Sequence, residues 1–171
     1  ETLEYIHSIP KFNRVLGNAL LEKLLNKMGN PQDNLKFIHI GGTNGKGSTC
    51  TMVSQILTEA GYKTGLFTSP FLKFFNERIK INGIPISNSD LADIASYVKN
   101  MTEKYDAFVS EFAFDTAVAF EYFNRQNCDF VILEVGLGGK LDATNIIKNP
   151  LVVGFTACLL YTSPSPRAEA I

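Results

Sequence analysis

The spacing of apolar and polar positions predicts helices that alternate with strands. Segment 14–28 carries apolar side chains at every fourth position, as an amphipathic helix does, and stops at Gly29-Asn30-Pro31. Segment 35–40 is a short β-prone run that ends at Gly41-Gly42, as a strand entering a tight turn does. A second helix is expected after that turn and before Gly61, with one apolar face made of Met52, Val53, Ile56, Leu57 and Ala60.

The alternation continues beyond Gly61. Lys63 to Thr68 is a second strand candidate, and the stretch 69–85 is expected to be irregular, with a turn at Asn82-Gly83. A Ser87-to-Asp90 cap predicts a helix to about Lys104. The remaining candidates are a helix at 112–125, a wholly apolar strand at 130–133 that is typical of a sheet centre, and a strand at 151–155.

Strands that alternate with helices predict an α/β fold with a mostly parallel, doubly wound sheet. Ligands of such sheets bind beyond the carboxyl ends of the strands. The tail 158–171 has no clear period, and its two prolines exclude a continuing helix or central strand. We therefore expect one domain over residues 1–157 and a separate tail that is disordered or non-native.

Composition limits the function classes. The 171 residues suit one domain, and 16 basic against 17 acidic side chains give a net charge of −1, which argues against binding of nucleic acid or membrane surfaces. The three cysteines are far apart and form no zinc pattern, which favours a reduced, cytoplasmic setting. The chain has no apolar run of membrane-spanning length and no initiator Met, so we expect a fragment.

The strongest chemical feature is the glycine-rich loop 41–49, which lies between a predicted strand and a predicted helix. Its glycines let backbone N–H groups point inward, the helix start adds a positive dipole end, and Lys46 supplies a charge. The strict phosphate-loop pattern fails, because Ile40 and Gly47 stand where it requires Gly and Ser or Thr. The loop is still expected to bind phosphate; the alternative is a turn without a ligand.

Two further residues are candidate metal ligands. Glu134 follows four buried apolar residues and should emerge at the carboxyl end of its strand, near the phosphate loop. A carboxylate there suits Mg²⁺, which prefers hard oxygen ligands and bridges to nucleotide phosphates. The Ser69 hydroxyl, after the second strand, could reach the same metal. The alternatives are a merely polar strand end for Glu134 and a turn cap for Ser69.

Other polar residues give weaker signals. Asp142 either orients a substrate or caps the following segment, and Asn76-Glu77-Arg78 is interpreted as a solvated loop. His39 is expected to be structural, because two distant histidines cannot build a Ser-His-Asp site.

Four motifs in order resemble the folylpolyglutamate synthase/dihydrofolate synthase family, a branch of the Mur ligase superfamily. The resemblance covers about residues 3–156, including Tyr5-Ile6-His7 and Gly29-Asn-Pro-Gln32 near the start. The motifs are Ile40-Gly-Gly-Thr-Asn-Gly-Lys-Gly-Ser-Thr49, Thr68-Ser-Pro70 with Phe74-Phe-Asn-Glu-Arg-Ile79, Asn82-Gly-Ile-Pro-Ile-Ser87, and Leu133-Glu-Val-Gly-Leu-Gly-Gly-Lys-Leu-Asp-Ala-Thr-Asn145.

The resemblance implies an incomplete ATPase domain of the Mur ligase type and ATP-dependent joining of L-glutamate to dihydropteroate or to a folate, through an acyl phosphate. It implies small-molecule substrates, ATP and Mg²⁺, and a monomer. By the same resemblance Lys46 is catalytic, the metal is held by Ser69 and Glu134, and the phosphates by Thr43, Asn44, Gly45, Lys46, Gly47 and Ser48. The pterin-bearing substrate is expected near Phe112, Leu141, Asp142 and Ala143.

The sequence departs from the family pattern in several places. Lys140 replaces the usual Arg, which keeps the charge but loses bidentate geometry, and Phe112-Ala113 replaces the usual Phe-Glu pair, with Glu111 upstream. The Leu-Asp-His segment, a lysine near the metal and the carboxyl-terminal ligase domain are absent, so we expect the fragment to be inactive. From about Ala157 the chain resembles translated read-through of a sequencing adapter; the alternative is a natural flexible tail.

Two other functions compete with the ligase. A kinase or GTPase is disfavoured, because no Ser or Thr directly follows Lys46 and no guanine-reading Asn-Lys-x-Asp sequence is present. A stand-alone nucleotide-binding module is the second alternative.

Overall fold

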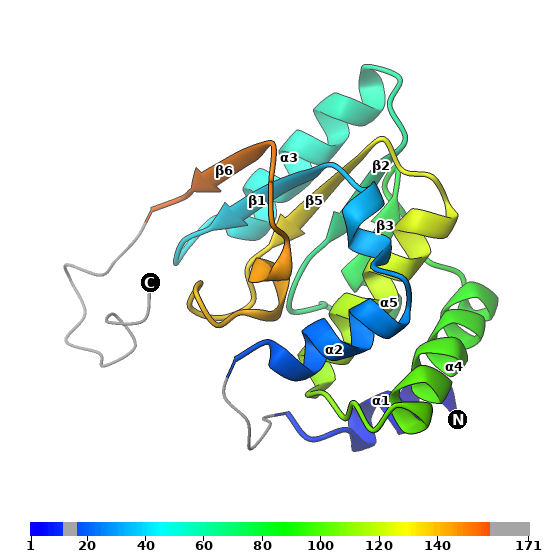
Figure 1. The fold of residues 1–171 in the computed structure, drawn as a ribbon. Helices are drawn as coiled ribbons and strands as arrows, with labels where there is room; N and C mark the ends of the chain where they lie inside the picture. Colours follow the sequence, from blue (N-terminus) through cyan, green and yellow to red (C-terminus); the bar gives the residue numbers. More distant parts are fainter. Residues whose placement is uncertain (12–16, 158–171) are drawn as a thin grey trace.

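The fold is a helix-covered sheet, seen in a computed structural model that describes residues 1–11 and 17–157 (Figure 1). The strands are β1 (Phe37–Gly41), β2 (Thr64–Phe67), β3 (Ile79–Ile81), β4 (Ile84–Pro85), β5 (Phe130–Glu134) and β6 (Val152–Phe155). They lie in the order β4-β3-β2-β5-β1-β6. Strands β2, β5, β1 and β6 pair in parallel, and β3 and β4 are antiparallel, which confirms a mostly parallel α/β sheet.

Strand β5 lies between β2 and β1, as its apolar sequence predicts. Leu133 is in register with Phe67 on one side and with His39 on the other. The residues from Val131 to Glu134 are all buried. A strand buried on both faces has no solvent side, which is why it shows no polar alternation.

Helices cover both faces of the sheet, as in a doubly wound fold (Figure 1). They are α1 (Thr2–Ser8), α2 (Ala19–Lys27), α3 (Lys46–Glu59), α4 (Asn88–Lys104) and α5 (Glu111–Arg125). Helix α3 packs on β1, β2 and β5 over a small cluster of buried residues that includes Cys50, Leu66 and Ile132. The other helices and the larger core lie on the opposite face.

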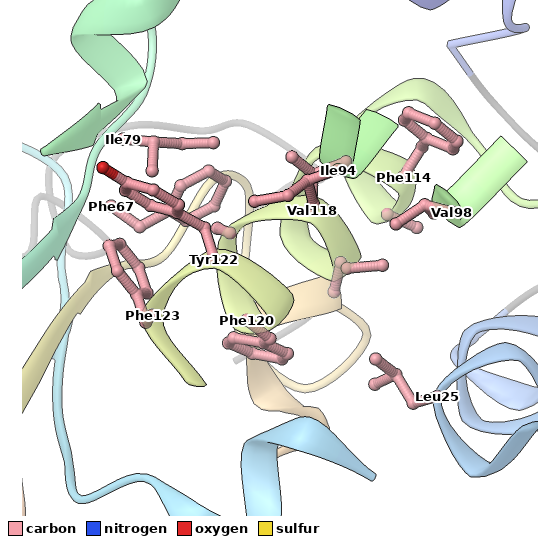
Figure 2. Packing of buried hydrophobic residues seen from close by; sticks show 14 of the residues in the cluster. Leu25, Phe67, Ile79, Ile94, Val98, Phe114, Val118, Phe120, Tyr122 and Phe123 are labelled. Atoms are coloured by element: carbon pink, nitrogen blue, oxygen red, sulfur yellow. The ribbon is translucent and has the colours of Figure 1, made fainter. Parts of the chain in front are cut away.

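Helix α5 is the centre of the larger core. Figure 2 shows side chains of α5 on both sides of the helix: Phe123 lies toward Phe67, and Phe114 lies toward Val98 of α4. Phe120 packs against Phe37 of β1, with ring centroids 5.3 Å apart. Because α5 is buried nearly all round, its amino end is held firmly beside the ends of the strands.

Three expectations about elements need correction. The helix expected over 14–28 begins at Ala19 within the described chain, since Gly17 has a φ of +88° and Asn18 is the cap; residues 14–16 lie outside the described residues. In α3 the predicted apolar face is only partly covered: Val53 and Leu57 pack against the small cluster, whereas Met52 and Ile56 are 58% and 67% exposed. The burial of Cys50 and Ser54 shows that the packing of α3 onto the sheet, not its apolar pattern, sets the helix rotation.

The third correction concerns 69–85, which is not irregular throughout. Its second half forms the β3–β4 hairpin around Asn82-Gly83, which extends the sheet beyond β2. Strands this short have no visible period in sequence. The tail 158–171, and with it the read-through interpretation, lies outside the described residues. None of the described helices is long and apolar enough to cross a membrane.

Candidate functional site

The carboxyl ends of β1, β5 and β2 meet at one edge of the sheet. After β1 the chain enters the glycine-rich loop and then α3, β2 leads to Ser69, and β5 ends at Glu134. Parallel neighbours β2, β5 and β1 place these three endings side by side. The sheet topology therefore brings together the residues for which the sequence predicts phosphate and metal binding.

The glycine loop curls because two of its residues adopt positive φ. Gly42 has a φ of +131° and Gly45 a φ of +81°, both costly for residues with a side chain. The N–H groups of Thr43 and Asn44 donate to the carbonyl of Ala157, 3.1 and 3.3 Å away, which ties the loop to the chain after β6. The amides best placed for an anion are therefore those of residues 45–48, at the start of α3.

Lys46 begins α3 and lies back over the loop. Its Nζ donates to the carbonyl of Thr43, 3.3 Å away. That bond is to a neutral acceptor, so a phosphate could replace it with a charge-assisted one.

Glu134 joins the loop to the end of β2. Its Oε2 accepts a hydrogen bond from the Ser69 amide at 2.9 Å, and a β-carbon at Gly47 would lie only 3.4 Å from the same oxygen. Burial raises the pKa of Glu134, against the opposing effects of the Ser69 amide and Lys46. A nearly buried carboxylate with a raised pKa is a group that a cation would stabilise in its charged form.

The donor set at this point suits a divalent cation. The Glu134 carboxylate and the Ser69 hydroxyl offer hard oxygens beside the glycine-rich loop, the kind of donor by which Mg²⁺ is commonly held with a nucleotide. Among the described residues no group of three or more His, Cys, Asp or Glu could hold a metal. Mg²⁺ commonly takes one or two protein oxygens and fills its other positions with phosphate and water, which these two donors would allow.

A cavity of about 660 Å³ extends from this edge toward α5 and the loop after β5. Its lining includes Lys46 and Ser69 at one end, and Phe112 at the start of α5. It also includes Leu141, Asp142 and Ala143. Lys46 of the glycine loop and Ser69 thus share one space with the residues predicted to lie near the acyl substrate, whereas Glu134 is not part of its lining. Gly136 lets Phe112 approach, since a β-carbon there would lie 2.6 Å from the Phe112 ring.

Asp142 caps a segment, as one of its two sequence interpretations expected. Its Oδ2 accepts from the Leu137 amide at 2.8 Å, and its Oδ1 accepts from the amide and hydroxyl of Thr144. The Thr144 hydroxyl also lies 2.8 Å from Nε2 of His39. Burial lowers the pKa of His39, so the ring is neutral and structural, as expected.

The interpretation of Asn76-Glu77-Arg78 as a solvated loop is wrong for Arg78. The Arg78 side chain is only 13% exposed and lines the cavity. Glu77 is solvated, but its carboxylate accepts from the amides of residues 72–74 and organises the turn, and these bonds lower its pKa. The sequence did hold one signal that Arg78 is not solvated: it lies close to three aromatic residues, Phe71, Phe74 and Phe75.

Two more cavity residues had no sequence signal. Asn18, just before α2, donates from Nδ2 to the Asp142 carbonyl at 2.8 Å, and Lys11 lines the same cavity. Glu111, just before Phe112, contacts the amino-terminal segment, since its Oε1 lies 3.2 Å from Nδ1 of His7. These contacts join segments more than 100 residues apart, which no local pattern reports.

The fold and the site define a mostly parallel α/β domain with a glycine-rich loop between β1 and α3. No protein-family model matches the chain. It is 39% identical over 165 residues to the folylpolyglutamate synthase of Lacticaseibacillus casei, covering 94% of this chain and 38% of that protein.

Two solved structures are also similar to the chain. A folylpolyglutamate synthase in complex with AMPPCP and folate matches with a TM-score of 0.85 and 38% identity, over 90% of this chain and 38% of that one. A bifunctional folylpolyglutamate synthase/dihydrofolate synthase with Mn, AMPPNP and L-glutamate bound matches with a TM-score of 0.81 and 32% identity, over 90% and 36%. By sequence and by structure, this chain is therefore a relative of the folylpolyglutamate synthases and dihydrofolate synthases. It spans about a third of the length of the curated relatives it matches.

Proposed function

We propose that this chain is the nucleotide-binding part of an ATP-dependent amide ligase. The ligase would add L-glutamate to dihydropteroate, to a folate polyglutamate, or to both, through an acyl phosphate. The observation that carries the proposal is the single cavity lined by Lys46 and Ser69 at one end and by Phe112 and Asp142 further along. The ligands in the structures of its relatives, a nucleotide analogue with folate or with Mn and L-glutamate, support the same assignment.

The chemistry explains why a phosphate loop and an acyl pocket would adjoin. A carboxylate is a poor electrophile, and phosphorylation turns one of its oxygens into a leaving group that the amino group of glutamate can displace. The loop residues Gly45, Gly47 and Ser48 would hold the ATP phosphates through their amides, and Thr43 and Asn44 would contribute side chains. Lys46 would leave the Thr43 carbonyl and neutralise charge on the transferred phosphoryl group.

A divalent cation fits beside this loop, with Ser69 and Glu134 as its protein ligands. When bound, Mg²⁺ would offset the charge of the phosphates. Glu134 would also keep the end of β2 aligned with the loop through its bond to the Ser69 amide. The two residues would thus position the phosphates as well as the cation.

The acyl substrate would lie along Phe112 and the 141–143 loop. Phe112 offers a ring that packs at 5.7 Å from the Phe67 ring, and Leu141 is 57% exposed at the mouth of the cavity. Asp142 would hold the shape of this wall, because its carboxylate is occupied by the amides of Leu137 and Thr144. Ala143 would add a small apolar contact.

The organisation around the site is part of the proposal. Residues 1–157 would form the ATP-binding unit, with 158–171 outside it, and the partners would be small molecules rather than nucleic acid or membrane. We expect a monomer in the cytoplasm, where the thiols of Cys50 and Cys128 would stay reduced.

Nucleotide binding is the first test. Calorimetry should show Mg²⁺-dependent binding of AMPPCP to the 171-residue chain, and Lys46→Ala should weaken it by about 100-fold because a charge at the phosphates is lost. Lys36→Ala, at the opposite end of β1, is the control and should bind as the unchanged chain does. Equal binding by the Lys46→Ala chain would contradict the proposed phosphate site.

Ligation is the second test. Residues 3–156 would replace the matching segment of the L. casei enzyme, and the chimera would receive ATP, labelled glutamate and either dihydropteroate or tetrahydrofolate. We expect label in an amide product with at least one acceptor and none with Lys46→Ala. A folded chimera that binds AMPPCP but joins glutamate to neither acceptor would contradict the ligase and favour a nucleotide-binding module.

A further inference from the structure

Arg78 is a buried cation with unused hydrogen-bond donors. It ends the short helix η2 (Phe75–Arg78), and its Nε and Nη1 have no hydrogen-bond partner in the described part of the chain. The nearest carboxylate, on Asp115 of α5, lies 3.8 Å from Nε, beyond hydrogen-bond distance, and its two oxygens also lack partners among the described residues. The two groups form an ion pair but no hydrogen bond with each other. Burying donors and acceptors without hydrogen bonds is costly, so the arrangement calls for another group that bonds to them.

Neighbouring rings and the backbone fix the position of Arg78. The guanidinium carbon lies 5.3 Å from the centre of the Phe71 ring and 5.7 Å from that of Phe75. The Arg78 carbonyl accepts from the Thr68 amide at 3.0 Å, so the residue is tied to the chain immediately before Ser69. A planar cation held between rings keeps its remaining donors aimed in one direction.

The guanidinium borders two adjoining cavities. One is the 660 Å³ cavity that contains Lys46 and Ser69. The other, of about 600 Å³, contains Asp115 and shares Lys11, Arg78 and Phe112 with the first. Arg78 therefore faces the space proposed for the acyl substrate, at a place separate from the phosphate loop.

The acids around Arg78 leave it able to take an anion. Glu111 is engaged by His7 at 3.2 Å. Burial raises the pKa of Asp115 to about 7, so near neutral pH a share of the molecules carries no charge there. Lys11 lines both cavities, and its ammonium adds a second positive charge near Arg78.

The two candidate acyl substrates differ in the number of carboxylates. Dihydropteroate has a single carboxylate, which must react, whereas a folate ends in glutamate and keeps a second carboxylate that does not react. We propose that Arg78 binds this second, non-reacting carboxylate and so favours glutamate-terminated substrates over pteroate. The proposal rests on the proposed function and assigns a specificity-determining residue within it.

The test compares two ligands that differ only in the glutamate. Dissociation constants for folate and for pteroate would be measured by calorimetry on the 171-residue chain, with AMPPCP as a third ligand. The unchanged chain should bind folate about tenfold more tightly than pteroate, because an Arg–carboxylate pair is a strong charge-assisted contact. Arg78→Gln should remove this preference and leave pteroate and AMPPCP binding unchanged, whereas Lys80→Gln, with the same charge change two residues away, should keep it.

Arg78→Lys is the second variant for the same measurement, to be used if Arg78→Gln does not fold. A lysine offers a point charge without the planar fork, so the preference for folate should fall about threefold. An unchanged preference in either Arg78 variant, or equal weakening of folate and pteroate, would overturn the proposal. If the unchanged chain bound AMPPCP but neither folate nor pteroate, the proposal for Arg78 would be overturned while the nucleotide site would stand. If the unchanged chain did not bind AMPPCP, the proposed function itself would be contradicted.

Discussion

The two ends of the cavity are built in different ways. The end proposed to bind phosphate, here called the phosphate end, depends mainly on one continuous stretch, 41–49, which supplies backbone amides at the start of α3 and the charge of Lys46. The end proposed for the acyl substrate, here called the acyl end, is assembled from five separate segments, represented by Lys11, Asn18, Arg78, Phe112 and Asp142. Backbone amides bind phosphate whatever side chains surround them, whereas recognition of a particular acyl group needs side chains from several elements.

This difference predicts that changes at the two ends act independently. A change at the phosphate end should weaken nucleotide binding and leave the acyl ligand alone, and the reverse should hold at the acyl end. Glu134 and Ser69 connect the two ends through their hydrogen bond. Changes at these two residues therefore show whether one end affects ligand binding at the other.

The largest effect is expected at Glu134. Glu134→Gln keeps the size of the side chain but removes the charge, so Mg²⁺-dependent AMPPCP binding should weaken by about 100-fold. Titration with AMPPCP at several Mg²⁺ concentrations measures it, and Glu103→Gln, on the exposed side of α4, is the charge-matched control. Binding that is equally dependent on Mg²⁺ in both variants would remove Glu134 from the metal site.

Asp115 should make stability depend on pH. Its pKa is raised to about 7 by burial, against the lowering effect of Arg78 and with a small raising effect of Glu111. The folded chain therefore holds a proton that the unfolded chain releases above its ordinary pKa of 3.8, so stability falls as pH rises through about 7. Between pH 5 and 8 the loss should be on the order of 2 kcal/mol.

Thermal unfolding from pH 5 to 8 measures that loss. Asp115→Asn cannot ionise and should flatten the profile. A profile with the same slope in both chains would exclude Asp115 as its source.

Asp142 should contribute to stability and to the acyl end alone. Asp142→Ala would leave the amides of Leu137 and Thr144 without their acceptor, at a cost of about 1–3 kcal/mol. Urea unfolding gives the loss, and calorimetry should show weaker pteroate binding with unchanged AMPPCP binding. Equal weakening of both ligands would mean that the two ends are coupled through the 136–145 loop.

The smallest effect is expected at Gly136. In Gly136→Ala the new methyl group would meet the Phe112 ring, which would have to move away from its contact with Phe67. Pteroate should bind about fivefold more weakly, in line with about 1 kcal/mol for a modest packing change. AMPPCP binding on the same variant is the internal control, and unchanged pteroate affinity would place the acyl group away from Phe112.

The sequence pattern was sufficient to predict an element where the residues that form it lie in one short segment. The apolar strand predicted at 130–133, the Ser87 cap of α4 and the glycine loop before α3 are local features, and each is present in the structure. The pattern was misleading for the exposed Met52 and Ile56 on α3. Helical periodicity shows that a helix has an apolar face, but the element that packs against the helix decides which residues are buried.

The residues of the candidate site also fall into those predicted from local sequence and those placed only by the tertiary structure. By itself, the sequence determined the strand–loop–helix unit and the chain order of the four parallel strands and the helices between them, because turn glycines, caps and apolar runs act over a few residues. Tertiary structure alone decided that Arg78 turns inward and that Glu134 bonds to the Ser69 amide. Most of these contacts join distant segments, and their geometry is fixed only when the sheet and α5 pack together.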